Sequence, residues 1–317
     1  MGARRHTTAT RGVRAVLALV AACVAASLTT AACSAARTAA PTPTGPPPSA
    51  AAIAPGTTGT VDLDGRPYRL HVPAGYVATT PAPLVVGLHG FTSRSSQLDS
   101  YLGLTAAADE RGFLLALPEG TTDHAGNQFW NAVEGGCCDL YSSRVDDSGY
   151  LSRLVTQVSA SYAVGRVAVI GHSNGGYMAQ RFACDHADQV DAIASLAGPL
   201  ASDTSLCRAS RPVRVLDIHG DADETVPYLG SAAERSASAM DTVRRWAVLD
   251  GCTSGPAEGA PLDLEATIAG AETTPTVWSG CRGGTGVRLW TIHGGRHVPT
   301  LTPAFTPDVL DVLLAQS

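Results

Sequence analysis

The sequence predicts an α/β domain in which helices cover both faces of a mostly parallel central sheet. Two observations lead to this prediction: short apolar runs alternate with longer amphipathic segments, and turn residues separate them. The length of 317 residues fits one such domain with appendages, because single cores of this class reach roughly 250–300 residues. The net charge is −6 and the chain has no lysine, so nucleic-acid binding has little support.

Residues 1–33 have the pattern of a signal peptide. A segment with four arginines precedes an apolar run from Ala15 to about Ala32. The residues around Cys33 resemble a bacterial lipobox, so we expect Cys33 to be lipidated and to tether the protein to the outer face of the cytoplasmic membrane. Cys23 follows a second match, and secretion after cleavage is the alternative. Residues 34–56, rich in Ala, Pro and Thr, predict a linker before a folded domain at 57–317.

The folded domain is predicted to begin with a hairpin and two buried strands. Asp64-Gly65 separates strands at 60–63 and 68–72, which is a strong hairpin signal. A strand at 84–88, a helix at 97–109, a strand at 113–117 and a long loop from 119 to about 147 follow.

The second half continues the alternation. We expect helices at 149–162, 174–186, 231–249 and 307–314, and strands at 167–170, 193–197, 213–218 and 287–292. In such sheets, functional side chains gather at the carboxyl ends of the strands. The loops after the strands are therefore the expected place for a site.

Six cysteines follow the targeting segment, and an even number in an exported protein predicts disulfides. We expect one bridge between Cys252 and Cys281. A bond within the adjacent pair Cys137 and Cys138 is expected to be strained. The pairing of the remaining four cysteines stays open among three connectivities; they are Cys137, Cys138, Cys184 and Cys207.

One strand ends in a G-x-S-x-G sequence, Gly171-His172-Ser173-Asn174-Gly175. The motif alone is a weak signal, but an apolar run precedes it and a helical segment follows, as in a nucleophile elbow. Such a turn exposes the hydroxyl of Ser173, and His172 beside it is expected to shape a pocket. The alternative is a serine in a strand-to-helix turn that has no chemistry.

A serine hydroxyl needs a base to remove its proton, and in this arrangement an acid and then a histidine follow along the chain. The loop after strand 213–218 contains three carboxylates. Asp223 is the expected acid, with Asp221 second and Glu224 third.

His297 is the expected base, because it lies in a glycine-rich loop after the last strand, whereas His293 still ends that strand. The oxyanion of a tetrahedral intermediate needs N–H donors, and we expect the main-chain amides of Phe91 and Asn174 to supply them. We expect no metal and no cofactor.

Together these motifs resemble the polyhydroxybutyrate depolymerase-like esterases, which have the α/β-hydrolase fold and are related to feruloyl and acetylxylan esterases. The resemblance covers residue 57 to the end and rests on segments at 83–90, 130–131, 137–138, 145–150, 171–178, 219–228 and 294–297. It implies a catalytic domain at 57–317 with a triad of Ser173, Asp223 and His297, and a substrate pocket near His172 and Trp130.

The resemblance implies an exported serine esterase that cleaves carboxylic esters of hydroxyalkanoate oligomers or small acyl groups through an acyl-enzyme. Val298 stands where the family often has Trp, and Phe91 where Cys is frequent, so insoluble polymer is a less expected substrate. Feruloyl or acetylxylan esters are alternative substrates. Acyl transfer in the cell envelope and a non-catalytic surface lipoprotein are alternative functions. We expect a monomer that has no nucleic-acid partner.

Overall fold

The computed structural model describes residues 52–316. The predicted signal peptide, Cys33 and the linker as far as residue 51 lie outside the described residues. Residues 52–56 are neither helix nor strand, and the first strand begins at Thr57. Within residues 52–316, no helix is long and apolar enough to cross a membrane.

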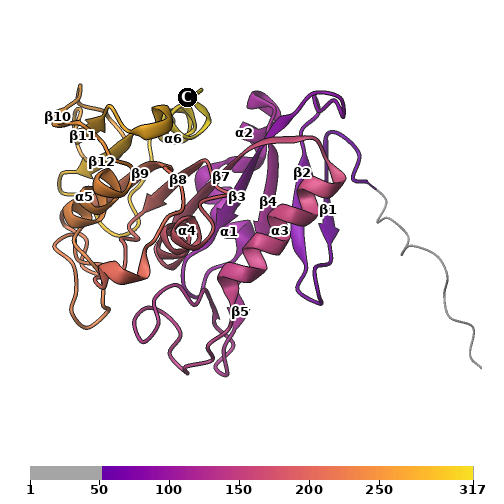
Figure 1. Ribbon diagram of the computed structural model, residues 1–317, viewed down its shortest axis with the longest axis horizontal. Helices are drawn as coiled ribbons and strands as arrows, with labels where there is room; N and C mark the ends of the chain where they lie inside the picture. The colour runs from indigo at the N-terminus through magenta and orange to yellow at the C-terminus, as the bar shows by residue number, and fades with distance from the viewer. Residues whose placement is uncertain (1–51, 317) are drawn as a thin grey trace, which may run out of the picture. The chain divides into compact units, whose positions relative to one another are not determined.

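Ten strands form one sheet in the order β1-β2-β4-β3-β7-β8-β9-β12-β11-β10 (Figure 1). The central strands from β4 to β12 in this order are parallel, and antiparallel strands complete both edges. The strands are β1 (Thr57–Val61), β2 (Tyr68–Val72), β3 (Ala82–Leu88), β4 (Leu114–Pro118), β7 (Val164–His172), β8 (Ala192–Leu196), β9 (Arg214–Gly220), β10 (Ser254–Glu258), β11 (Thr273–Ser279) and β12 (Val287–Ile292). Two short strands, β5 (Thr121–Thr122) and β6 (Gln128–Phe129), pair separately.

Helices cover both faces of the sheet, as predicted. On one face lie α3 (Asp147–Ser161), α4 (Asn174–Asp185) and α5 (Ala239–Leu249); on the other lie α1 (Ser95–Leu102), α2 (Leu104–Arg111) and α6 (Phe305–Leu314). A hydrophobic core lies on each face of the sheet, and alternate residues of a strand pack into one core or the other. Leu84 and Val86 face α3 and α4, and Val85 faces the opposite side. Each such fully buried side chain stabilises the fold by about 1.5–3 kcal/mol.

Two of the predicted helices differ from the structure. The helix expected at 97–109 is divided at Gly103, whose φ of 62° is left-handed and ends α1. The helix expected at 231–249 begins only at Ala239, where Ser238 caps the amide of Asp241. Residues before it form a turn closed by paired main-chain bonds between Ser231 and Ser236. The edge strand β10 and its neighbour β11 were not predicted.

Three disulfides are present within the described residues. Cys252 bonds Cys281, as expected, and Cys184 bonds Cys207. The third joins the adjacent residues Cys137 and Cys138, a pairing that was left open among the three connectivities and for which strain was expected. The peptide bond between them is cis, and their Cα atoms are 3.1 Å apart.

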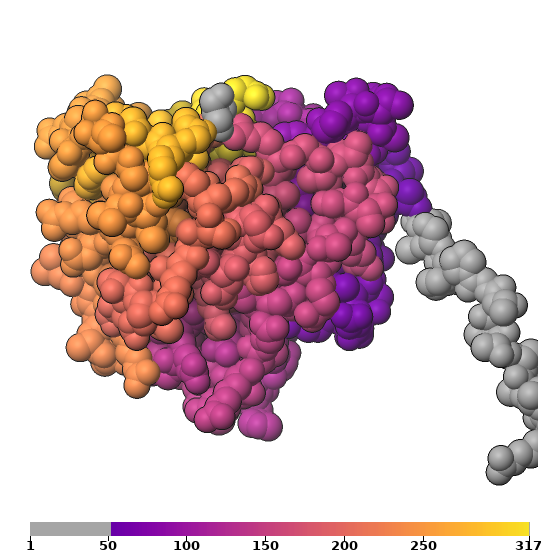
Figure 2. Space-filling view, in the orientation of Figure 1, coloured from indigo at the N-terminus to yellow at the C-terminus, as the bar shows by residue number. Residues whose placement is uncertain are grey.

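The long loop 119–147 packs beside residues 200–238, as Figure 2 shows in magenta and orange-red at the lower part of the molecule. Arg235 donates a hydrogen bond across this contact to the carbonyl of Glu134 at 3.2 Å. The loop is thus held against the domain on the side of the sheet where α4 lies.

Candidate active site

Ser173 lies in a sharp turn between β7 and α4. Its φ of 55° and ψ of −122° are unusual for a residue with a side chain, and its amide donates to Leu196 O at 2.8 Å. The next turn of chain passes close to β3, because a Cβ at Gly175 would lie 2.0 Å from the carbonyl oxygen of Leu88. Glycine is therefore required there, and the turn presents the Ser173 hydroxyl at the carboxyl edge of the sheet.

The structure brings Ser173, His297 and Asp223 together. The distance from His297 Nε2 to Ser173 Oγ is 2.8 Å, and His297 Nδ1 lies 2.7 Å from Asp223 Oδ2. The imidazole therefore connects a hydroxyl on one side with a carboxylate on the other, although His297 is 124 residues from Ser173 and 74 residues from Asp223 along the chain. This geometry permits proton transfer from the hydroxyl to the imidazole.

The carboxylate of Asp223 is buried and fully partnered. Its Oδ1 atom accepts hydrogen bonds from the amides of Thr225 and Val226, both at 2.8 Å. Burial alone would raise the pKa of Asp223, but the neighbouring His219 imidazole and hydrogen bonds from His297 and the Val226 amide hold it well below its usual range. Asp223 is therefore ionised at neutral pH and can stabilise a protonated His297.

The other two carboxylates of this loop do not contact His297. Asp221 accepts hydrogen bonds from His293 Nδ1 at 2.9 Å and from the amide of Gly294 at 2.7 Å. Glu224 is exposed. Asp221 thus fixes the first residues of the loop that carries His297, while Asp223 contacts the imidazole itself.

Two aromatic residues also hold the His297 loop. His172 Nε2 donates to the carbonyl of His297 at 2.9 Å, and Tyr101 Oη donates to the carbonyl of Pro299 at 2.7 Å. Burial lowers the pKa of His172 to about 4, although the hydrogen bond to the carbonyl of His297 opposes this, so its ring is neutral. Further along, the buried carboxylate of Glu265 accepts from the amide of Thr300 at 2.8 Å. The loop that carries the imidazole is therefore held by His172, Tyr101 and Glu265.

The amides of Phe91 and Asn174 are the expected oxyanion donors, and Phe91 lines the same cavity as Ser173. Phe91 follows β3, and Asn174 is the first residue of α4. Within residues 52–316, neither amide donates a hydrogen bond to another protein group. Two free donors beside the nucleophile, one of them at the positive end of a helix, suit a developing negative charge.

Trp130 has a different place from the one expected. It is fully buried and does not line the cavity beside Ser173. Its Nε1 donates to His89 O at 2.9 Å, and its main chain exchanges two hydrogen bonds with the side-chain amide of Asn174, at 2.7 and 2.9 Å. Trp130 therefore joins the loop after β3 to the start of α4 and fixes the separation of the two amides.

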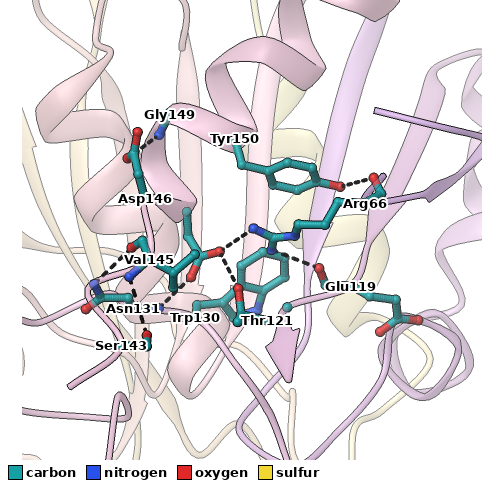
Figure 3. A network of polar contacts seen from close by, with 12 residues as sticks. Arg66, Glu119, Thr121, Trp130, Asn131, Ser143, Val145, Asp146, Gly149 and Tyr150 are labelled. Atoms are coloured by element: carbon teal, nitrogen blue, oxygen red, sulfur yellow. Dashed lines mark hydrogen bonds and ion pairs between the residues drawn. The ribbon is translucent and has the colours of Figure 1, made fainter. Parts of the chain in front are cut away.

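A buried polar network includes the main chain next to Trp130 (Figure 3). The fully buried carboxylate of Asp147 accepts hydrogen bonds from Arg66 at 2.7 Å, Thr121 at 3.2 Å and the amide of Asn131 at 2.8 Å. The Arg66 guanidinium also stacks on the ring of Tyr150, 3.8 Å from its centroid. The network fastens the chain next to Trp130 to the domain.

An apolar cavity of about 360 Å³ opens beside Ser173. His172 lines it, as expected. The other residues that line it are Gly90, Phe91, Ser93, Gln97, Leu98, Tyr101, His297 and Val298. The hydroxyl of Tyr101 is engaged with Pro299, so this residue offers the cavity only its ring.

The family described as "Putative esterase" matches residues 64–252, which include Ser173 and Asp223. The chain belongs to this esterase family. His297 lies beyond the matched segment, and only the fold brings it to the other two residues.

Two curated relatives and one solved structure agree with this family assignment. Feruloyl esterase B of Piromyces equi is 28% identical over 71% of this chain and 41% of that protein. The putative esterase NocK of Nocardia uniformis subsp. tsuyamanensis is 31% identical over 69% of this chain and 57% of that protein. The chain thus spans about half the length of these curated relatives. An acetyl xylan esterase from Aspergillus awamori has a TM-score of 0.58 at 15% identity, covering 81% of this chain and 99% of that one, which shows the α/β-hydrolase fold.

Several residues of this esterase site have no clear signal in the sequence. Tyr101 and Glu265 reach the His297 loop from distant elements, and neither stands in a recognisable motif. Asp147 belongs to the segment 145–150, in which the sequence gives no sign of the buried ion pair with Arg66. Within residues 52–316, no group of three or more His, Cys, Asp or Glu side chains is arranged to hold a metal ion.

Proposed function

We propose that the protein hydrolyses carboxylic esters through an acyl-enzyme on Ser173. The observation that carries the proposal is the continuous contact from Ser173 Oγ to His297 and from His297 to Asp223, at 2.8 and 2.7 Å. His297 removes the hydroxyl proton while Ser173 attacks the ester carbonyl, and the amides of Phe91 and Asn174 bind the oxyanion. His297 then protonates the leaving alcohol, and the same residue activates water to release the acid.

The acyl or alcohol group that enters the cavity is proposed to be compact and apolar. Leu98, Tyr101 and Val298 give the cavity an apolar wall, and no charged side chain lines it. Hydroxyalkanoate oligomers and small acyl esters satisfy these limits. Feruloyl esters are the second candidate, because the cavity has aromatic walls and relatives in the family are named feruloyl esterases.

We also propose that the protein works outside the cytoplasm. Three disulfides within the described residues favour an oxidising compartment. A lipid on Cys33 would keep the enzyme at the outer face of the membrane. Mass spectrometry of the protein isolated from its native membrane fraction would detect the lipid, and a protein recovered wholly from the medium would contradict the tether.

The activity is tested with purified protein on four substrates: hydroxybutyrate oligomers, short p-nitrophenyl esters, methyl ferulate and acetylated xylan. We expect turnover that Ser173→Ala abolishes without loss of folding. An added alcohol acceptor distinguishes hydrolysis from acyl transfer, because a hydrolase releases mainly free acid. Turnover by folded Ser173→Ala equal to that of the wild type would remove the proposal.

A further inference from the structure

Two ionisable side chains of β9 lie behind the proposed catalytic acid. Asp217 and His219 are both fully buried, and as residues two apart in a strand they point to the same face of the sheet. None of the catalytic steps above uses either of them. A buried carboxylate and a buried imidazole need partners, so their surroundings indicate what they do.

His219 is in contact with Asp223. Its Nε2 donates to Val226 O at 2.9 Å and lies 3.4 Å from Asp223 Oδ2. The same oxygen of Asp223 lies 2.7 Å from His297 Nδ1. The carboxylate of Asp223 therefore stands between two imidazoles, one facing Ser173 and one buried behind it.

Asp217 faces the helices rather than the triad. Its Oδ2 accepts from Gln180 Nε2 at 3.0 Å, and Gln180 in turn accepts from Trp246 Nε1 at 2.6 Å. The second oxygen of Asp217 and the Nδ1 atom of His219 have no hydrogen-bond partner within the described residues. Asp217 lacks a donor for its second oxygen, and His219 can bind an additional proton at Nδ1. An ionised Asp217 and a protonated His219 therefore stabilise each other.

We propose that Asp217 and His219 form a charge-coupled pair that acts through Asp223 and weakens the basicity of His297. The two side chains make no direct hydrogen bond, so the coupling is Coulombic, which burial strengthens. When Asp217 is ionised and His219 is protonated, the positive charge of His219 lies beside Asp223. It offsets part of the negative charge of Asp223, which stabilises protonated His297.

The ionisable groups that face His219 are Asp217, Asp223 and the edge-on ring of Tyr228. Burial would lower the pKa of His219, but Asp223 and Asp217 outweigh it and raise the pKa. Burial raises the pKa of Asp217 to about 7, with His219 opposing the rise, so Asp217 is partly ionised at pH 7 and becomes fully ionised above it. Both groups are positioning residues, and the inference rests on the proposed function only in treating His297 as the base.

The test is ¹⁵N NMR of the full chain labelled at histidine, in which His219→Gln and His297→Gln assign the two rings. In the wild type at pH 7, we expect both ring nitrogens of His219 to be protonated. In Asp217→Asn, His219 is expected to be neutral, and the titration midpoint of His297 to rise by about one pH unit. His219→Gln is expected to give the same rise, and the double variant no more than either single variant.

Asp250→Asn is the matched control, because Asp250 is an equally buried carboxylate that binds the Val213 amide at the opposite end of β9. We expect it to leave the His297 midpoint unchanged. A neutral His219 in the wild type at pH 7 would overturn the inference, as would an unchanged His297 midpoint in folded Asp217→Asn. If that variant does not fold, the wild-type spectrum and His219→Gln decide alone.

These spectra are recorded without substrate, so the two proposals fail separately. An active esterase with a neutral His219 refutes only the charge-coupled pair. A protein with the expected titrations that hydrolyses no ester refutes only the proposed function.

Discussion

The buried network around Asp147 gives a stability prediction whose size follows from its contacts. Asp147→Asn keeps one acceptor oxygen but turns an NH₂ group toward a donor, either Arg66 or the amide of Asn131. Breaking a buried ion pair from one side costs about 3–5 kcal/mol. The Arg66 side chain is 27% exposed, so water recovers part of this, and we expect a loss of about 2–3 kcal/mol.

For a domain of this size, that loss lowers Tm by about 5–10 °C. Differential scanning calorimetry measures it, with Asp64→Asn as the control. Asp64 pairs with Arg153 at 3.1 Å, but the two side chains are 68% and 52% exposed, so Tm is expected to stay within about 1 °C. A Tm for Asp147→Asn within about 2 °C of the wild type would refute the reasoning, because it would mean that Arg66 and Asn131 do not depend on this carboxylate.

Three further predictions concern the acid, the pH dependence and the turn. Asp223→Asn is expected to lower kcat by on the order of 10⁴, and Asp221→Asn by less than about tenfold; equal losses would contradict the assignment of the acid. Burial raises the pKa of Asp250 to about 7, so folding takes up a proton and stability is lost as pH rises from about 4 to 7. The free energy of urea unfolding should fall less between pH 4 and 7 in Asp250→Asn than in the wild type, by on the order of 2–4 kcal/mol. An equal fall with pH in both proteins would count against this burial effect. Gly175→Ala should prevent folding, whereas Gly75→Ala, whose Cβ meets nothing within 4 Å, should not; circular dichroism compares them.

The central sheet could be predicted because its strands are short apolar runs between turns, and the predicted strand at 287–292 matches β12. Strand β11, next to the edge strand β10, gave no such signal, since it is half-buried and contains Pro275. The segment 231–238 has a composition compatible with a helix, but the positive φ of Arg235 and the cap at Ser238 delay the helix to Ala239. Local pattern cannot reveal this choice, because loop contacts decide it.

Ser173, Asp223 and His297 could be predicted because each follows a strand in a fixed order, and parallel strands bring their carboxyl ends together. The supporting residues could not. Trp130 looked like a pocket residue, but its burial and its bonds to His89 and Asn174 depend on how the loop 119–147 folds back on the domain. Contacts of that kind are set by tertiary packing and leave no periodic trace in the sequence.

A single labelling experiment tests the esterase assignment most directly. Purified full-chain protein is treated with a fluorophosphonate, which forms a stable bond with an activated serine, and intact-protein and peptide mass spectrometry locate the adduct. We predict one adduct, on the peptide that contains Ser173, and none on folded Ser173→Ala. A folded wild-type protein that stays unmodified, or that carries its adduct on a different residue, would contradict the claim that His297 and Asp223 activate this hydroxyl.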